Sequence, residues 1–196
     1  MKKTLFGLLS LLSFSSTAQI GQGGTVTGNM ETNVQYLNTD TLIGAFAPEQ
    51  KLVANSYMNV NYSVNKFRAG VRFESYLPSI AGYPQFYSGS GIGYRYAQYA
   101  GDKITVTAGN FYEQFGSGLI FRAYEERALG LDNAMNGASI KFNPRHGIEL
   151  KGVIGRQRYR FDAGNVFYSD AIVRGIDGSI SLNDVIPGFE ASDFKI

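Results

Sequence analysis

Apolar and polar side chains alternate along most of the chain between residues 25 and 182. In the run 52–64, one parity carries apolar residues such as Leu52, Met58 and Val60, whereas the other carries Asn55 and Asn59. A strand sends successive side chains to opposite faces, so such a run has one apolar and one polar face. The pattern therefore predicts an antiparallel, all-β chain.

Turns rich in Gly, Asn, Asp and Pro divide this pattern into about nine strands. The expected strands cover residues 25–37, 52–64, 67–76, 92–97, 103–110, 116–121, 138–143, 148–161 and 172–182. Short turns at Asn65-Lys66 and Gly101-Asp102 alternate with long loops at 38–50 and 77–90. This rhythm is typical of an up-and-down transmembrane β-barrel with its short turns in the periplasm.

The first 18 residues have the features of a secretory signal peptide. Lys2 and Lys3 precede an apolar stretch, and small residues ending at Ala18 precede Gln19. We therefore expect a signal peptide at 1–18, and residues 19–196 to form part of a barrel in the outer membrane, in contact with its lipid and lipopolysaccharide. The chain has no cysteine, so lipid anchoring of the bacterial lipoprotein type is not expected.

Composition agrees with this class without proving it. Aromatic residues are 14 % of the chain, all Phe and Tyr, and 24 residues are glycine. Soluble β-sandwiches share most of this composition. Without the two lysines of the signal peptide, basic and acidic residues balance, so nucleic acid is not an expected partner.

Two sets of charged residues are the candidate site. The first set shares the polar face of neighbouring strands, as a charged stripe in a pore or as ion pairs that fill the lumen: Arg68, Arg72, Glu74 and Arg95. On strand 92–97 we expect Arg95 to face inward, and Tyr94 and Tyr96 outward.

The second set lies in the irregular segment 111–137, where 123–129 has helix-forming composition and Gly130 is a plausible helix stop. The segment is either a plug or constriction in the lumen or a solvated extracellular loop. Its charged candidates are Arg122, Glu125, Glu126, Arg127 and Asp132.

Three further arginines, Arg156, Arg158 and Arg160, alternate along strand 148–161 and so share one face. At the bilayer midplane each would cost about 2–4 kcal/mol. We expect them beyond the membrane, near lipopolysaccharide phosphates, or in the lumen.

The tail from Asn183 is polar, contains Pro187 and does not alternate. Single-chain bacterial barrels have an even number of strands, whereas this pattern gives about nine. We therefore expect the N-terminal portion of a larger, incomplete barrel; a complete eight-stranded barrel is the alternative.

Several strings resemble one family: GTVTGNMETNVQYL, GIGYRYAQYAGDKITVTAGNFYEQFG, and the run from GNFYEQFG to AMNG followed by IKFNP and LKGVIGRQR. The family comprises large Bacteroidota outer-membrane proteins catalogued as a domain of unknown function. The resemblance covers residues 24–183. It implies a location and an architecture but no reaction or catalytic residue. By analogy, a role as a subunit of an envelope complex is possible.

An enzyme is not expected. The single histidine, His146, lies in a Pro-Arg-His-Gly turn, and no nucleophile elbow or metal-spaced cluster occurs. We expect no cofactor and no metal. The predicted function is a porin-like channel or an uptake role for small solutes; the alternative is a non-enzymatic accessory subunit of an envelope secretion or assembly complex.

Overall fold

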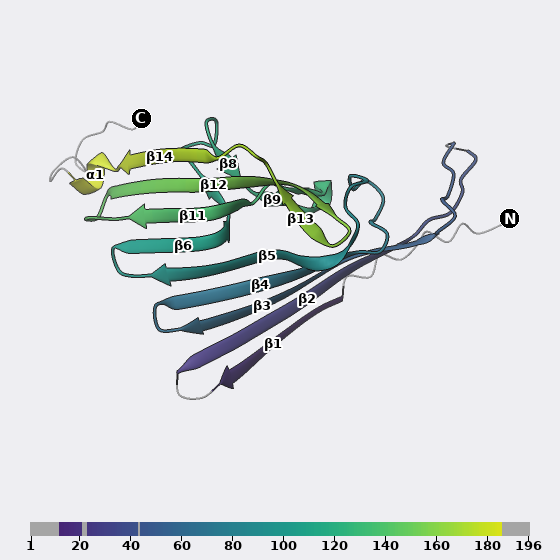
Figure 1. Ribbon diagram of the computed structural model, residues 1–196, viewed down its shortest axis with the longest axis horizontal. Helices are drawn as coiled ribbons and strands as arrows, with labels where there is room; N and C mark the ends of the chain where they lie inside the picture. Colours follow the sequence, from purple (N-terminus) through teal and green to yellow (C-terminus); the bar gives the residue numbers. More distant parts are fainter. Residues whose placement is uncertain (1–11, 21–22, 43, 186–196) are drawn as a thin grey trace.

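The computed structural model describes residues 12–20, 23–42 and 44–185, with the side chains of the last two ranges, and shows an all-β chain (Figure 1). The main sheet contains β1 (Leu12–Ile20), β2 (Gly24–Tyr36), β3 (Leu52–Val64), β4 (Phe67–Tyr76), β5 (Gly89–Ala100), β6 (Ile104–Phe111), β11 (Met135–Phe142), β12 (Ile148–Asp162), β13 (Asn165–Tyr168) and β14 (Val173–Ile180).

Each strand from β1 to β6 pairs antiparallel with the next, β6 pairs with β11, and β11 with β12. Both β13 and β14 pair with β12. The predicted all-β, antiparallel, up-and-down arrangement is therefore confirmed. The sheet is open over the described residues, because β1 pairs there only with β2 and β14 only with β12.

The connections differ in length at the two ends of the sheet (Figure 1). Asn65-Lys66 joins β3 to β4, with Asn65 in the left-handed region at φ 52°, and residues 101–103 join β5 to β6. The opposite end carries the loops 37–51 and 77–88 and the segment 112–134. We call these the turn end and the loop end.

The segment 112–134 contains only short elements: β7 (Glu113–Gln114), β8 (Arg122–Ala123), β9 (Glu125–Glu126), the 3-10 helix η1 (Arg127–Leu129) and β10 (Leu131–Asp132). The strand expected at 116–121 is wrong, because these residues form turns and bends. The helix expected at 123–129 shrinks to one turn. Gly130 does end it, in the left-handed conformation with φ 62°.

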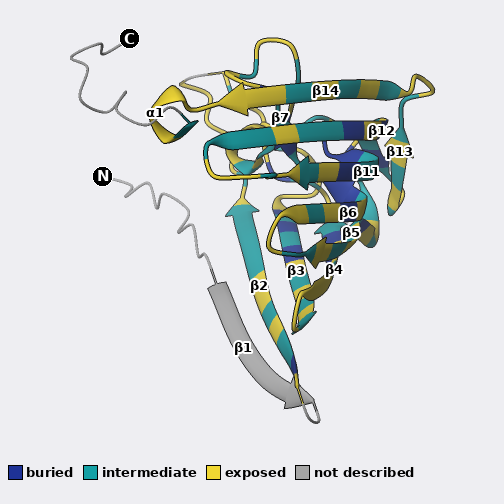
Figure 2. Cartoon of the chain, turned by 90° about the vertical axis from the view of Figure 1, so that its left-hand side faces the viewer, coloured by how far each residue is buried: buried dark blue, intermediate teal, exposed yellow. Residues whose placement is uncertain are grey.

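The sheet curves, and buried residues gather inside the curve (Figure 2). On β3 and β4 the buried positions include Asn55, Tyr57, Arg72 and Glu74, and we call their side of the sheet the concave face. The opposite, convex face carries exposed apolar side chains such as Met58 and Phe73. Alternation thus predicts the two faces correctly, but here the polar face is the buried one.

Two apolar clusters stand beside the polar residues of the concave side. One joins the segment 112–134 to β6, β11 and β12; the other joins β3 and β4 to the loop 77–88 and β12. The buried members are Phe111, Phe115, Ala123, Met135 and Val153 in the first, and Tyr57, Tyr76, Tyr87 and Phe161 in the second.

A bulge on β5 reverses the faces expected for that strand. Tyr94 pairs with Arg72 and Ile92 with Phe73, so Gly93 is an extra residue. Beyond it Tyr94 lies on the concave face, and Arg95, opposite Val71, lies exposed on the convex face. The inward position predicted for Arg95 is therefore wrong, because one inserted residue shifts the parity of the rest of β5.

The predictions for the chain ends are only partly covered by the structure. Residues 1–11 of the expected signal peptide, and 186–196 of the tail with Pro187, lie outside the described residues. Residues 12–20 form β1, and a short helix α1 (Leu182–Val185) follows β14. Within the described residues, no helix is long and apolar enough to cross a membrane.

Candidate functional site

Two arginines and two carboxylates form an alternating ring on the concave face. Arg72 and Glu74 come from β4, Asp132 from β10 and Arg158 from β12. Each arginine contacts both carboxylates, at 2.7–2.8 Å. All four residues are buried, Glu74 completely. A buried ion pair is tolerated only when such mutual hydrogen bonds replace water.

The polar groups around the ring satisfy its remaining oxygens. Tyr76 donates a hydrogen bond to Glu74 at 3.0 Å, and Tyr112 donates one to Asp132 at 3.0 Å. Arg158 also donates to the backbone oxygen of Gly93 at 3.1 Å. A Cβ atom at Gly93 would overlap the carboxyl group of Glu74, so the β5 bulge needs a glycine here.

The ion pairs continue from the ring along the concave face towards β2. Glu125 accepts from Arg72 at 2.9 Å and from Arg127 at 3.1 Å, and Arg127 pairs with Glu31 of β2 at 2.7 Å. The guanidinium of Arg127 also lies 4.4 Å from the ring centre of Tyr57. An unbroken chain of opposite charges therefore crosses the concave face from β2 to β12 and holds the segment 112–134 against the sheet.

An aromatic cluster lies at the loop end of this charge chain. The rings of Tyr76 and Phe161 pack edge to face, with centroids 5.3 Å apart, and Tyr87 packs on Tyr76 at 4.9 Å. Burial raises the pKa of Tyr87, which lies in the loop 77–88, to about 12. Its hydroxyl therefore stays protonated at neutral pH, and the loop adds no charge to the site.

A second, smaller set of ion pairs lies nearer the turn end. Glu113 accepts from Lys141 of β11 at 2.8 Å and approaches Lys151 of β12 at 3.5 Å. At the turns themselves, Lys66 binds Asp102 at 2.8 Å on the exposed surface. The hydrogen bond from Lys66 lowers the pKa of the Asp102 carboxyl.

The structure unites the two sets of candidates that the sequence kept apart. Arg72 and Glu74 from the first set meet Glu125, Arg127 and Asp132 from the second. The others stay outside the charge chain: Arg68 is exposed on the concave face, Arg95 is on the convex face, Arg122 stacks on Tyr124 at 4.2 Å, and Glu126 caps η1.

Arg158, like Arg95, was misplaced by sequence reasoning. The three arginines of β12 do not share a face, because Arg156 is exposed, Arg158 is buried and Arg160 is intermediate. β12 pairs with β11 as far as Gln157 and with β13 from Arg158 onward, so the change of face between Arg156 and Arg158 falls where β12 changes its partner strand. Simple alternation had no means of locating this irregularity.

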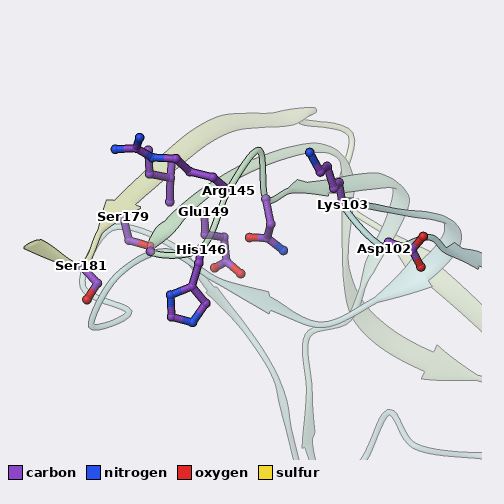
Figure 3. A pocket seen from close by; sticks show the side chains of 10 residues that line it. Asp102, Lys103, Arg145, His146, Glu149, Ser179 and Ser181 are labelled. Carbon is purple, nitrogen blue, oxygen red and sulfur yellow. The ribbon is translucent and has the colours of Figure 1, made fainter. Parts of the chain in front are cut away.

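A cavity of about 580 Å³ lies at the turn end (Figure 3). Asp102 and Lys103 stand on one side of it, and His146, Ser179 and Ser181 on the other (Figure 3). The side chain of His146 is 87 % exposed and its Nδ1 is 3.4 Å from Asp184. Within the described residues no group of three or more His, Cys, Asp or Glu side chains could hold a metal ion.

A family model matches the chain over residues 1–196, and its description is a family of unknown function, DUF6029. The chain belongs to the DUF6029 family. No curated protein and no solved structure matches this DUF6029 chain. The predicted resemblance to a family of unknown function is therefore confirmed. The outer-membrane location and the Bacteroidota origin of that family stay predictions.

Proposed function

We propose that this DUF6029 chain forms part of the wall of an outer-membrane β-barrel. Its convex face lies against lipid and its concave face lines a water-filled lumen. The proposal is supported by the polarity of the two faces of the sheet. Exposed apolar side chains cover the convex face, and buried charged side chains lie on the concave face. A soluble β-sandwich buries the apolar face of its sheets. Lipid-facing barrels do the reverse, with a polar interior.

The convex face supports lipid contact over many strands. Met30, Met58, Phe73 and Ile92 form one row across β2 to β5, each opposite the next and each exposed. Ile104, Phe142 and Leu150 form another row across β6, β11 and β12. Soluble monomers rarely expose continuous apolar patches of such extent.

Aromatic side chains follow the turn end of the same face, where barrels carry an aromatic girdle. The exposed aromatic residues there are Tyr62, Phe67, Tyr99 and Phe142. The rings of Phe67 and Tyr99 contact each other, with centroids 5.1 Å apart. These residues fit the membrane boundary nearest the short turns, on the periplasmic side.

On the concave face, the segment 112–134 acts as a constriction. The charge chain that holds it is mixed in sign, with the carboxylates of Glu31, Glu74, Glu125 and Asp132 facing the guanidiniums of Arg72, Arg127 and Arg158. Such a lumen narrows a passage without selecting strongly for either charge. A porin-like channel or uptake protein for small solutes is therefore the function that we propose.

Cysteine labelling tests this orientation, because the natural chain has no cysteine. Thr105 and Val106 are neighbours on β6 that face the concave and the convex side, respectively. In liposomes, a charged maleimide should label the Thr105→Cys variant and spare the Val106→Cys variant, and both should react after denaturation. Equal labelling of the two variants in intact liposomes would overturn the proposal.

The passage itself is tested by single-channel recording in planar bilayers. We expect small conductance steps from the full chain. If cysteine labelling shows that the chain is inserted correctly but no conductance is recorded, the channel role is wrong and only the role as a membrane wall is retained.

The open edges of the sheet favour a larger assembly. An unpaired strand edge presents free backbone N–H and C=O groups, which a membrane cannot satisfy. We propose that further strands continue the sheet beyond β14. A second candidate function, an accessory subunit of an envelope complex, would supply these strands from a partner, and purification from native membranes should then return stable partner proteins.

A further inference from the structure

A second cavity, of about 390 Å³, opens on the concave face between the charge chain and the turn end. Its floor is formed by β4, β5, β6 and β11, and residues 111–113 lie at its margin. This volume lies within the range of small-molecule sites. None of the roles proposed above uses this cavity.

Aromatic rings form one part of its lining. Tyr94 and Tyr112 stack almost in parallel, with ring centroids 5.3 Å apart and 20° between their planes. Tyr96 packs on Tyr94 at 6.0 Å and donates a hydrogen bond to Asn61 at 3.2 Å. These contacts fix the rings, and a fixed ring offers a flat apolar surface at a low entropic cost.

Hydrogen-bonding groups form the other part, from Gln98, Thr105, Thr107 and Ser139. Gln98 uses its amide nitrogen to bind Thr107 at 3.0 Å. Its amide oxygen and the hydroxyl groups of Thr105 and Ser139 have no side-chain hydrogen bond to another described residue. A wall with both flat apolar rings and free hydroxyl or amide groups matches a sugar, whose ring has a C–H face and a rim of hydroxyls.

Positive charge is in excess around the cavity. Two cations, Arg68 and Lys141, line it against one carboxylate, that of Glu113, which Lys141 binds at 2.8 Å. Arg68 makes no ion pair with any residue that the structure describes. A free guanidinium binds carboxylate and phosphate groups with directed hydrogen bonds.

We propose that this cavity binds an acidic sugar, that is, a pyranose with a carboxylate or phosphate group. The ring packs on Tyr94 and Tyr96, the hydroxyls bind Gln98, Thr105 and Ser139, and the anionic group binds Arg68. This inference rests on the proposed function, since it names one class of small solute that binds to the concave face beside the passage.

Calorimetric titration of the full chain in detergent micelles tests the site with four probes: glucuronate, glucose 6-phosphate, glucose and inorganic phosphate. The two acidic sugars should bind at least about tenfold more tightly than glucose or phosphate, because each of those lacks one half of the contacts. Phosphate binding as tight as that of both acidic sugars would show a plain anion site and overturn the proposal. Absence of binding by the acidic sugars would also overturn it.

Arg68→Gln should weaken the binding of acidic sugars about tenfold and leave glucose unchanged. The matched control is Arg95→Gln, which removes the same charge from the convex face of the neighbouring strand and should change nothing. Equal losses in both variants would contradict a local site.

The cysteine labelling separates this inference from the proposed function. If Thr105→Cys and Val106→Cys label as expected but no acidic sugar binds, only the ligand is wrong. If Arg68→Gln weakens the binding of acidic sugars but Val106→Cys is labelled in liposomes, the sugar site is supported and the proposed membrane orientation is wrong.

Discussion

Arg158 and Glu74 are joined by two hydrogen bonds, of 2.7 and 3.0 Å, although 84 residues separate them in the sequence. Their strands, β12 and β4, are not neighbours in the sheet, since β5, β6 and β11 lie between them. The pair therefore crosses the curve of the sheet rather than following it. Together with Arg72 and Asp132, it ties both sides of the concave face to the segment 112–134.

Glu74→Gln should destabilise the fold by about 3–5 kcal/mol, because it leaves two buried guanidiniums with a single full carboxylate partner in the ring. Chemical unfolding in detergent, followed by circular dichroism, measures the loss. The control is Asp102→Asn, which breaks the exposed pair with Lys66 and should cost far less. Equal effects of the two variants would show that burial adds nothing to the ring.

Gly93→Ala should destabilise by about 1–3 kcal/mol, since the new methyl group overlaps the Glu74 carboxylate and must displace it from Arg158. Gly178→Ala is the matched control on β14, where the nearest atom is a flexible methyl group of Leu150 at 3.2 Å. The midpoint of thermal unfolding should fall for the first variant only. A native midpoint for Gly93→Ala would mean that the ring rearranges freely.

Alternation along the sequence predicts the faces of β2, β3 and β4 because β3 pairs in unbroken register with both β2 and β4. It fails from Gly93 onward, since a bulge adds one residue and reverses the parity. The run Gly89-Ser90-Gly91-Ile92-Gly93 contains a hint, as glycine inside a strand often marks a bulge. No local pattern says which of its glycines is the extra residue.

Five members of the charge chain were candidates in the sequence, but Glu31 was not among them, and the connections between the members were not predictable. The sequence puts Arg72 and Glu74 on a polar strand face and Glu125, Arg127 and Asp132 in an irregular segment. Their meeting depends on how that segment folds back over the sheet, which is a tertiary event. Arg158 was assigned to the same face as Arg156 because alternation treats β12 as one regular strand, whereas its pairing with β11 ends at Gln157.

Arg95→Leu should make the protein more stable in lipid bilayers, by up to about 2–4 kcal/mol if Arg95 lies near the midplane. The reason is its exposed position on the convex face, opposite Val71. Reversible unfolding from liposomes measures the gain. A matched Arg68→Leu variant, on the concave face, should show no gain. If Arg95→Leu destabilises or aggregates the chain, the convex face contacts water and the membrane proposal fails.

Arg127→Gln should loosen the segment 112–134, because Arg127 alone links that segment to Glu31 of β2 and also contacts Glu125. We expect larger conductance steps in planar bilayers, as the constriction opens, and faster cleavage of the segment by protease in detergent. Arg122→Gln is the control. Arg122 lies in the same segment, where its guanidinium stacks on Tyr124, and it makes no ion pair with any residue in the described part of the chain. Unchanged conductance and cleavage in the Arg127→Gln variant would show that the ion pairs of Asp132 with Arg72 and Arg158 hold the segment without Arg127.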